Sequence, residues 1–297
     1  MNIKSTLLSM ITYLLISAPA WSAAVEVEKV TYSESQATAL LNDTVERIID
    51  AYGQAYIDLV TPQRFVKKEI ERGLNRVKEK SIARFEYQYT TAAGELKTRI
   101  YHSFSGATPA PNFPANSPHY NVDFNAQINQ QMRDDERLVT GKISEEEYAT
   151  DSSYFHASSY ARANDAEVKA LRKIEQDITS GELSGGGELT VFINQIPCQS
   201  CMPLFKEKLA NWPSIEKAEI SYLPQTEQNL INLPQDSEWR IYLQENNAIA
   251  VSGEATELQS AFTSARKTMA TFKNFKVRVL SADKAADSGD ITGACAL

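Results

Sequence analysis

Residues 164–209, NDAEVKALRKIEQDITSGELSGGGELTVFINQIPCQSCMPLFKEKL, decide the fold that we expect for this chain. The first part carries apolar side chains at helical spacing, on Val168, Leu171, Ile174 and Ile178. The glycine-rich run 181–187 ends this helix, and the run 188–196 predicts a strand that ends at Pro197. A second helix is expected over 198–212. Helices and strands that alternate in this way predict an α/β fold with one layered core.

The segments before this stretch predict two helices and then a hairpin. Residues 33–60 show helical periodicity, and a second helix is expected to begin at Thr61 and Pro62, a cap followed by a proline at the first helical position. Residues 85–89 and 96–104 alternate on either side of a short turn, which predicts a β-hairpin. After the stretch, we expect strands at 218–223, 239–243 and 275–280 and a helix at 257–272.

The composition is that of an ordinary soluble globular protein, with 42% hydrophobic and 23% charged residues. The formal net charge of −8 supplies no global basic field that would hold a nucleic-acid backbone. A nucleic-acid ligand would therefore have to bind at a local patch.

Residues 1–23 are typical of a secretory signal peptide. Lys4 lies before an apolar core over 7–16, and the small residues that follow predict cleavage near Ala23. The core is shorter than the ~20 residues that span a bilayer, and no later stretch is long and apolar enough. We expect a secreted or periplasmic protein with no membrane span in the mature chain.

The chain contains three cysteines, Cys198, Cys201 and Cys295. Secreted domains that disulfides stabilise usually carry more cysteines, in even number. The close pair therefore indicates a chemical role, whereas nothing in the sequence explains Cys295.

Two short motifs stand at the expected helix starts. Asp165-Ala166-Glu167 opens the first helix, and Pro197-Cys198-Gln199-Ser200-Cys201 opens the second. In this order they resemble the two halves of the zinc site in the cytidine-deaminase-like superfamily, H-x-E followed by P-C-x-x-C. The chain looks most like the bacterial polymorphic-toxin deaminases within it. The resemblance extends over 85–280 in the layout of elements, whereas the specific motif residues are few.

The resemblance implies a fold and a metal site. The fold is a mixed sheet with helices on both faces, preceded by an N-terminal helical region. Zn²⁺ would be held by Cys198, Cys201 and Asp165, which stands where the family usually has histidine, and Glu167 would be the catalytic acid and base. An aspartate oxygen is an acceptable zinc ligand, and His156 or His102 is an alternative third ligand.

The resemblance also implies an activity. This is the hydrolytic deamination of cytosine or adenine in a nucleotide or a single-stranded nucleic acid, by a toxin or effector that an immunity protein would block. His156, Tyr160 and Pro197 are the substrate-binding residues that we expect.

Two other interpretations remain open. A strand that leads into C-x-x-C at a helix start is also typical of thioredoxin-like oxidoreductases, and an exported disulfide enzyme would carry a signal peptide. In that case Leu223-Pro224 or Leu233-Pro234 would stand for the cis-proline of that family. The third interpretation keeps the zinc without catalysis, as a structural or degenerate site in a binding protein. Asp165-Ala166-Glu167 by itself also fits an ordinary helix start, where an acidic cap and a first-turn glutamate are common.

We therefore expect four segments. They are a signal peptide over 1–23, an N-terminal helical region over 24–82, a deaminase-like domain over 83–281 with an insertion over 106–163, and a flexible tail over 282–297.

Overall fold

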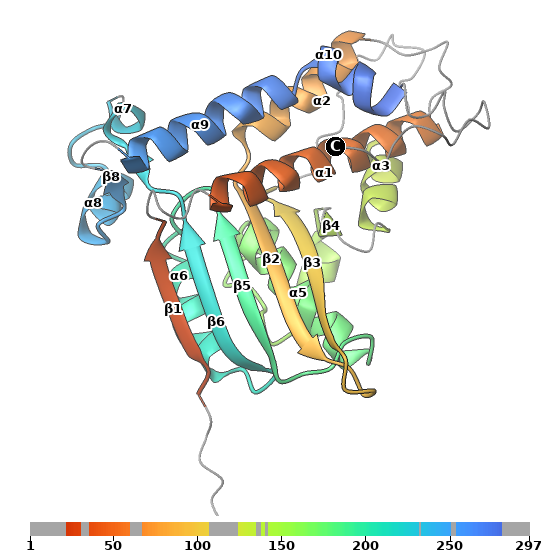
Figure 1. The fold of residues 1–297 in the computed structure, drawn as a ribbon, viewed down its shortest axis with the longest axis vertical. Coiled ribbons are helices and arrows are strands. Elements are labelled where there is room, and N and C mark those ends of the chain that lie inside the picture. Colours follow the sequence, from red (N-terminus) through yellow and green to blue (C-terminus); the bar gives the residue numbers. More distant parts are fainter. Residues whose placement is uncertain are drawn as a thin grey trace, which may run out of the picture.

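The structure is a computed structural model, and it describes residues 22–30, 36–59, 67–106, 124–134, 138–139, 142–231, 233–250 and 254–280. The expected tail, Cys295 and nearly all of the expected signal peptide lie outside these residues. The described residues form a mixed α/β structure, as predicted, around a sheet of order β1-β6-β5-β2-β3-β4 (Figure 1). Its strands are β1 (Ala24–Lys29), β2 (Ile82–Thr90), β3 (Leu96–Phe104), β4 (Leu138–Val139), β5 (Gly187–Ile193) and β6 (Ile215–Tyr222).

The centre of the sheet joins a hairpin to a parallel layer. β2 and β3 are antiparallel, and β2 is also antiparallel to β5. β5, β6 and β1 run parallel to one another, and β4 runs parallel to β3. The predicted hairpin is confirmed, and Gly94 in its turn has a φ of 81°, which glycine adopts without strain.

One face of the sheet is covered by two helical segments that run behind it in Figure 1. The first is α5 (Ala166–Thr179), and the second passes from α6 (Cys201–Pro203) through a π-helical turn, η4 (Leu204–Lys208), into a 3₁₀ turn, η5 (Leu209–Asn211). Alternate strand residues such as Phe85, Tyr87 and Val191 are buried against them in one apolar core. Both helices that the central stretch predicts are therefore present.

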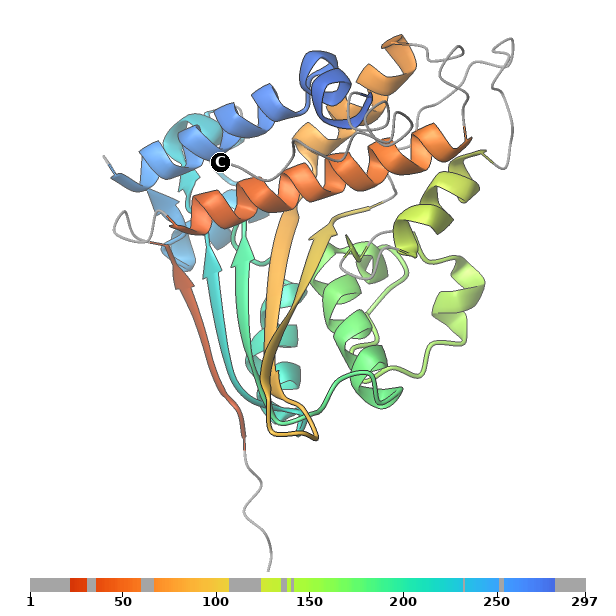
Figure 2. The ribbon, with the colours of Figure 1, turned by 45° about the vertical axis from the view of Figure 1, so that its right-hand side comes forward.

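A second helical layer crosses the other face near the end at which β5 and β6 stop (Figure 2). It consists of α1 (Gln36–Leu59), α2 (Lys67–Glu79), α9 (Glu254–Met269), α10 (Phe272–Phe275) and the π-helical turn η6 (Lys276–Leu280). Phe192 on β5 and Phe104 on β3 pack into the core of this layer. Helices thus lie on both faces, although Gln88 and Glu188, further along that second face, are exposed.

The remaining elements are short. They are α3 (Phe124–Arg133), α4 (Glu145–Ala149), η3 (Arg162–Asn164), α7 (Glu227–Leu230), α8 (Glu238–Glu245) and a separate parallel pair of β7 (Gln225–Thr226) and β8 (Ile249–Ala250). None of the described helices is long and apolar enough to cross a membrane.

The sheet begins earlier in the chain than predicted. Residues 24–29, which were assigned to the N-terminal helical region, form β1 at the edge of the sheet, where Val25 pairs with Ala218 of β6. Val25 and Val27 alternate with glutamates, and the two valines pack against the main core. A period of two over six residues produces a half-buried strand and cannot produce a helix.

Two predicted strands are helical. Residues 239–243 lie in α8, where Ser237 caps the helix by accepting from the Arg240 N–H, and the neighbouring Tyr242 and Leu243 are buried. Residues 275–280 form the end of α10 and the turn η6, with Phe275 and Val279 buried four positions apart and Val277 exposed. In both segments β-branched or aromatic residues suggested a strand, and packing against neighbouring helices decided otherwise.

Candidate metal site

The cysteine pair lies on the turn that follows β5. Cys198 precedes the helix and Cys201 is the first residue of α6; the N–H groups of Cys201 and Met202 both donate to the carbonyl oxygen of Cys198, at 2.9 Å. This turn brings the two thiols to the same side, with 3.2 Å between their sulfur atoms. Cys201 is buried, and Cys198 is partly exposed.

Asp165 is held at the start of α5 by the turn before it. Asn164 is buried, its side-chain oxygen accepts from the Ile143 N–H at 3.0 Å, and its backbone oxygen accepts from the Gly106 N–H at 2.8 Å. Asp165 occupies the N-cap position, but its side chain makes no capping hydrogen bond. The carboxylate is therefore not used by the helix, contrary to the ordinary role of an aspartate at this position.

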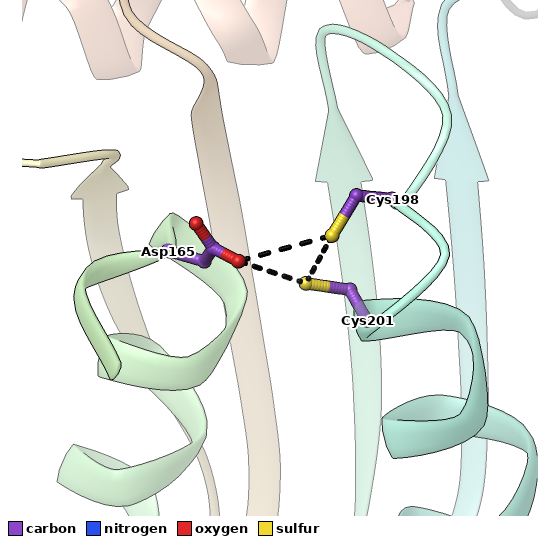
Figure 3. Close-up of side chains that lie close together, drawn as sticks. All are labelled: Asp165, Cys198 and Cys201. Carbon is purple, nitrogen blue, oxygen red and sulfur yellow. Dashed lines mark hydrogen bonds between the residues drawn. The ribbon is translucent and has the colours of Figure 1, made fainter. Parts of the chain in front are cut away.

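The carboxylate of Asp165 points instead at the two cysteines (Figure 3). Its Oδ2 lies 3.8 Å from Sγ of Cys198 and 3.7 Å from Sγ of Cys201. The three ligand atoms all lie within 4.8 Å of one another. Two thiols and a carboxylate at this separation form a group that could hold a metal ion.

The two thiols differ in acidity. Hydrogen bonding from Cys201, then the Ser200 hydroxyl at 3.0 Å and the Cys201 N–H, lowers the pKa of Cys198 to about 6 against the effect of burial. The hydrogen bond with Cys198, followed by burial, raises the pKa of Cys201 well above its usual value. The pair therefore holds one proton near neutral pH, on Cys201, and a metal ion that binds both sulfurs must release it.

Glu167 lies in the first turn of α5 and is buried, with 4% of its surface exposed. Burial raises the pKa of its carboxyl group to about 8, and the nearby Cys198 and Asp165 add to the rise. A hydrogen bond with the Cys201 thiol acts in the opposite direction, which places Glu167 beside the cysteine pair. A carboxyl group in this setting exchanges a proton near neutral pH.

Arg162 supplies the one described cation at this group of side chains. Its Nη1 lies 3.5 Å from Oδ2 of Asp165 and 3.9 Å from Sγ of Cys198, and half of its side chain is exposed. Arg162 lies outside both sequence motifs, and its position three residues before Asp165 is the local signal that could have indicated it. Tyr242 on α8 is a second contact residue that the sequence motifs do not indicate. Its hydroxyl donates to the Pro197 carbonyl at 2.7 Å.

The expected substrate-binding residues lie around the metal group rather than in it. His156 stacks on Tyr148 at 4.7 Å between ring centroids, and its Nδ1 contacts Asp151 at 3.2 Å. Tyr160 lies against the same Tyr148 ring, at 5.9 Å. Pro197 is buried beside Cys198. A role of His156, Tyr160 and Pro197 in substrate binding therefore stays a prediction.

Neither of the alternative histidine ligands belongs to the metal group. Nδ1 of His102 lies 3.0 Å from the Thr44 hydroxyl of α1, on the opposite face of the sheet. His156 contacts Asp151 through its Nδ1 and stacks on Tyr148 instead. The prolines proposed to stand for a cis-proline do not do so either, since no described peptide bond is cis, including those before Pro224 and Pro234.

Comparison with protein-family models gives no match for this chain, and comparisons with curated proteins and with solved structures give none either.

Proposed function

We propose that this protein is an exported zinc-dependent deaminase that acts hydrolytically on cytosine or adenine in a nucleotide or a single-stranded nucleic acid. The observation that carries the proposal is the convergence of Asp165, Cys198 and Cys201 on one point, with the buried carboxyl group of Glu167 beside them. Three ligands with an adjacent acid that is not a ligand are what a hydrolytic zinc site requires.

The separations within the group suit zinc. Tetrahedral zinc with its usual bond lengths places two thiolate sulfurs about 3.8 Å apart and a sulfur and a carboxylate oxygen about 3.6 Å apart. The two sulfur–oxygen separations, 3.7 and 3.8 Å, match this geometry. The two sulfurs, at 3.2 Å, would move apart by about half an ångström. Three protein ligands leave the fourth position open, as in catalytic zinc sites.

Glu167 would move the protons of the reaction. When bound, zinc supplies Lewis-acid activation of a water molecule near neutral pH. Glu167 would accept a proton from that water and deliver protons to the ring nitrogen and to the leaving amine. A C–O bond forms, the C–NH₂ bond breaks, one water is consumed and ammonia leaves. The pKa of Glu167, about 8 without a metal, would be lower beside a divalent cation, which would favour the carboxylate form that accepts the first proton.

The order of elements supports the proposal independently of the distances. The hairpin β2–β3 precedes α5, β5 follows, and the cysteine turn comes next. This is the layout that the resemblance to the deaminase superfamily implies, with both motifs at helix starts on one end of the sheet (Figure 3). Export follows from the signal-like residues 1–23, and action as a toxin with an immunity partner follows from the toxin-type resemblance alone.

Metal content and free thiols test the proposal first. The mature protein, purified without chelator, is expected to hold one zinc per chain, and Cys198→Ser is expected to lose it. The zinc-loaded protein is then assayed for ammonia release from cytosine and adenine nucleotides, single-stranded DNA and RNA. A chain without metal whose two cysteines are joined in a disulfide would overturn the zinc site.

Glu167→Gln separates catalysis from metal binding. The amide keeps the shape of the side chain but cannot exchange the proton, so we expect full zinc content and an unchanged fold with all deaminase activity lost. Glu207→Gln, at an exposed position of η4, is the matched control and should keep activity. A Glu167→Gln variant that still deaminates would rule out the assigned role.

A second candidate is a thiol–disulfide oxidoreductase. The observation that favours it is the unequal pair itself: Cys198, partly exposed, has a pKa lowered to about 6, whereas Cys201 is buried with a raised pKa. An exposed nucleophilic thiolate with a buried resolving thiol is the arrangement of dithiol oxidoreductases. Cys201→Ser would then trap mixed disulfides with partner proteins, and the absence of trapped species would count against this function.

A further inference from the structure

Lys169 on α5 is a buried lysine that forms no ion pair with a described carboxylate. Its side chain is 4% exposed, its Nζ donates to the Gly106 carbonyl at 3.2 Å, and it lies 4.5 Å from the ring centroid of Phe104. Among the described residues, no carboxylate oxygen lies within 4.0 Å of Nζ of Lys169, the distance at which an ion pair would form. One carbonyl and one ring face leave at least one N–H of the ammonium group without an acceptor in the described part of the chain.

A second ammonium group lies close to it. Nζ of Lys80 donates to the Ser105 carbonyl at 2.6 Å and lies 5.1 Å from the same Phe104 ring, and it too has no carboxylate partner among the described residues. Burial first, and then the charge of Lys80, lowers the pKa of Lys169 to about 7, and the negative charges of Asp165 and Glu167 oppose this shift only in part. Two neighbouring cations in a partly apolar setting destabilise each other unless an anion lies between or beside them.

Lys169 also lines a cleft on the outward side of α5. The cleft has a volume of about 820 Å³ and is bordered by α3, by the segment around Asp151 and by α5 itself. The other charged groups in it have partners: Arg172 pairs with Asp151 at 3.1 Å, and Lys173 pairs with Asp177 at 2.8 Å. Glu175 accepts the N–H groups of residues 154 and 155. Among the described lysine and arginine side chains that line the cleft, Lys169 is the one that forms no ion pair, since Arg133 pairs with Glu147.

The position of Lys169 links this charge to the metal group. It follows Asp165 by four residues, so the two α-carbons are about one helical turn, ~6 Å, apart and on the same side of α5. A ligand whose reacting ring lies at Asp165 and the cysteines could therefore extend along α5 towards Lys169. In a nucleotide or a strand, the group that would arrive there is a phosphate.

We propose that Lys169, with Lys80 beside it, forms a phosphate-binding site at the edge of this cleft, which holds the phosphate of the nucleotide or strand whose base is presented to the metal group. The inference rests on the proposed function for the identity of the ligand. The anion site itself rests only on the buried ammonium group of Lys169, the half-buried one of Lys80 and the cleft. Phosphate fits because it accepts charge-assisted hydrogen bonds from an ammonium group through several oxygens at once.

Binding measurements test the site without any assay of turnover. Inorganic phosphate, a nucleoside, its 5′-monophosphate and a short single-stranded oligonucleotide are titrated into the full protein by calorimetry. We expect Lys169→Met to weaken phosphate binding by about tenfold or more, the loss of one charge-assisted hydrogen bond, and to leave nucleoside binding unchanged. Lys169→Arg, which keeps the charge, should retain part of the affinity.

Two further variants control for side effects. Lys173→Met removes a lysine from the same cleft that already has a carboxylate partner, and should change phosphate affinity by less than about threefold. Lys80→Met should weaken phosphate binding in a chain whose Lys169 is intact. Thermal unfolding establishes that each variant is folded.

The arms of the titration separate the possible sources of the phosphate. A monophosphate that binds more tightly than its nucleoside only when Lys169 is present identifies a nucleotide, and the same dependence seen with the oligonucleotide alone identifies a strand. Phosphate binding that is the same in wild type and Lys169→Met, or absent from the wild type, overturns the proposal. If phosphate binding depends on Lys169 while no base is deaminated, the anion site stands and the proposed deaminase function fails.

Discussion

At the scale of single residues, the aspartate at position 165 changes the charge balance of the proposed site. Two thiolates and a carboxylate around a divalent ion leave one net negative charge, whereas an imidazole in place of Asp165 would leave none. The guanidinium group of Arg162, near both Asp165 and Cys198, restores neutrality. Groups that contact the ligands from outside tune metal affinity in this way.

Arg162→Gln should therefore weaken zinc binding by roughly tenfold, because the anionic ligand set loses its compensating charge. Arg162→Lys, which keeps the positive charge, should weaken zinc binding less. The zinc affinity is measured by competition with a chromogenic chelator at fixed pH. Arg133→Gln is the control, because it removes an exposed arginine that pairs with Glu147. Equal zinc affinities in the wild type and Arg162→Gln would show that the guanidinium group plays no part.

Lys169 gives a pH-dependent prediction about stability. Its pKa is about 7 in the folded protein and ~10.4 in an unfolded chain, so between these values the unfolded state binds more protons. Stability of the wild type should then rise with pH across this window. Lys169→Met removes the buried charge and should raise the free energy of unfolding at pH 7 by about 1 kcal/mol or more.

The advantage of Lys169→Met over the wild type should shrink steadily from pH 7 to pH 10, where the wild-type lysine is neutral in the folded state. Urea unfolding at several pH values measures this advantage. The difference in the free energy of unfolding between the two proteins cancels the titration of other groups such as Glu167 and Cys198. A difference that does not vary with pH would mean that Lys169 is not buried as a strained cation.

At the scale of elements, the start of β5 is set by a glycine. A Cβ on Gly187 would overlap the backbone oxygen of Gln88 and lie 2.7 Å from the Tyr87 ring. The Tyr87 hydroxyl accepts from the Gly187 N–H at 3.1 Å and donates to the Ser184 carbonyl at 2.8 Å. The close approach of β5 to β2 at this point aligns the strand that carries the cysteine turn.

Gly187→Ala should destabilise the protein by about 1–3 kcal/mol, because a backbone oxygen cannot move aside as a flexible side chain can. Gly185→Ala is the matched control: its new Cβ would meet nothing closer than 3.6 Å, so its effect should be small. Chemical unfolding of both variants provides the comparison. Equal effects at the two positions would contradict the packing argument.

At the scale of the whole molecule, the proposed metal joins parts of the chain that only the sheet holds together. Asp165 is the N-cap residue of α5, Cys198 lies on the turn after β5, and Cys201 is the first residue of α6. A metal bound to both fixes the two helical segments on one face relative to each other. Because the unfolded chain lacks the preformed site, metal binding adds to folding stability.

Removal of the metal with a chelator should therefore lower the thermal unfolding temperature of the wild type by several degrees, as a loss of about 2–3 kcal/mol would. Cys198→Ser should unfold near the temperature of the metal-free wild type and should not respond to chelator. Glu167→Gln should respond as the wild type does. A wild type whose unfolding temperature is insensitive to chelator and to added zinc would contradict a metal that links α5 and α6.

The amino-acid sequence alone determined the elements whose signals are local. The hairpin β2–β3, the helix α5 and the cysteine turn each lie within a short window, where periodicity, glycine and proline act on neighbouring residues. The three candidate ligands were recognisable for the same reason, because each motif stands at the start of its own helix. Residues 239–243 and 275–280 were misassigned since their aromatic and β-branched side chains suit a strand or a buried helix face equally.

Only the tertiary structure decided which distant segments meet. β1 finds its place through parallel pairing with β6, far along the chain, and no local pattern names that partner. The approach of Asp165 to within 3.7 Å of Cys201 depends on the packing of α5 and α6 on one sheet face. The hydroxyl of Tyr242 on the Pro197 carbonyl and the two ammonium groups around Phe104 likewise join segments that are far apart in the sequence. Such contacts are set by the sum of many burial energies over the whole core, which no short stretch of sequence contains.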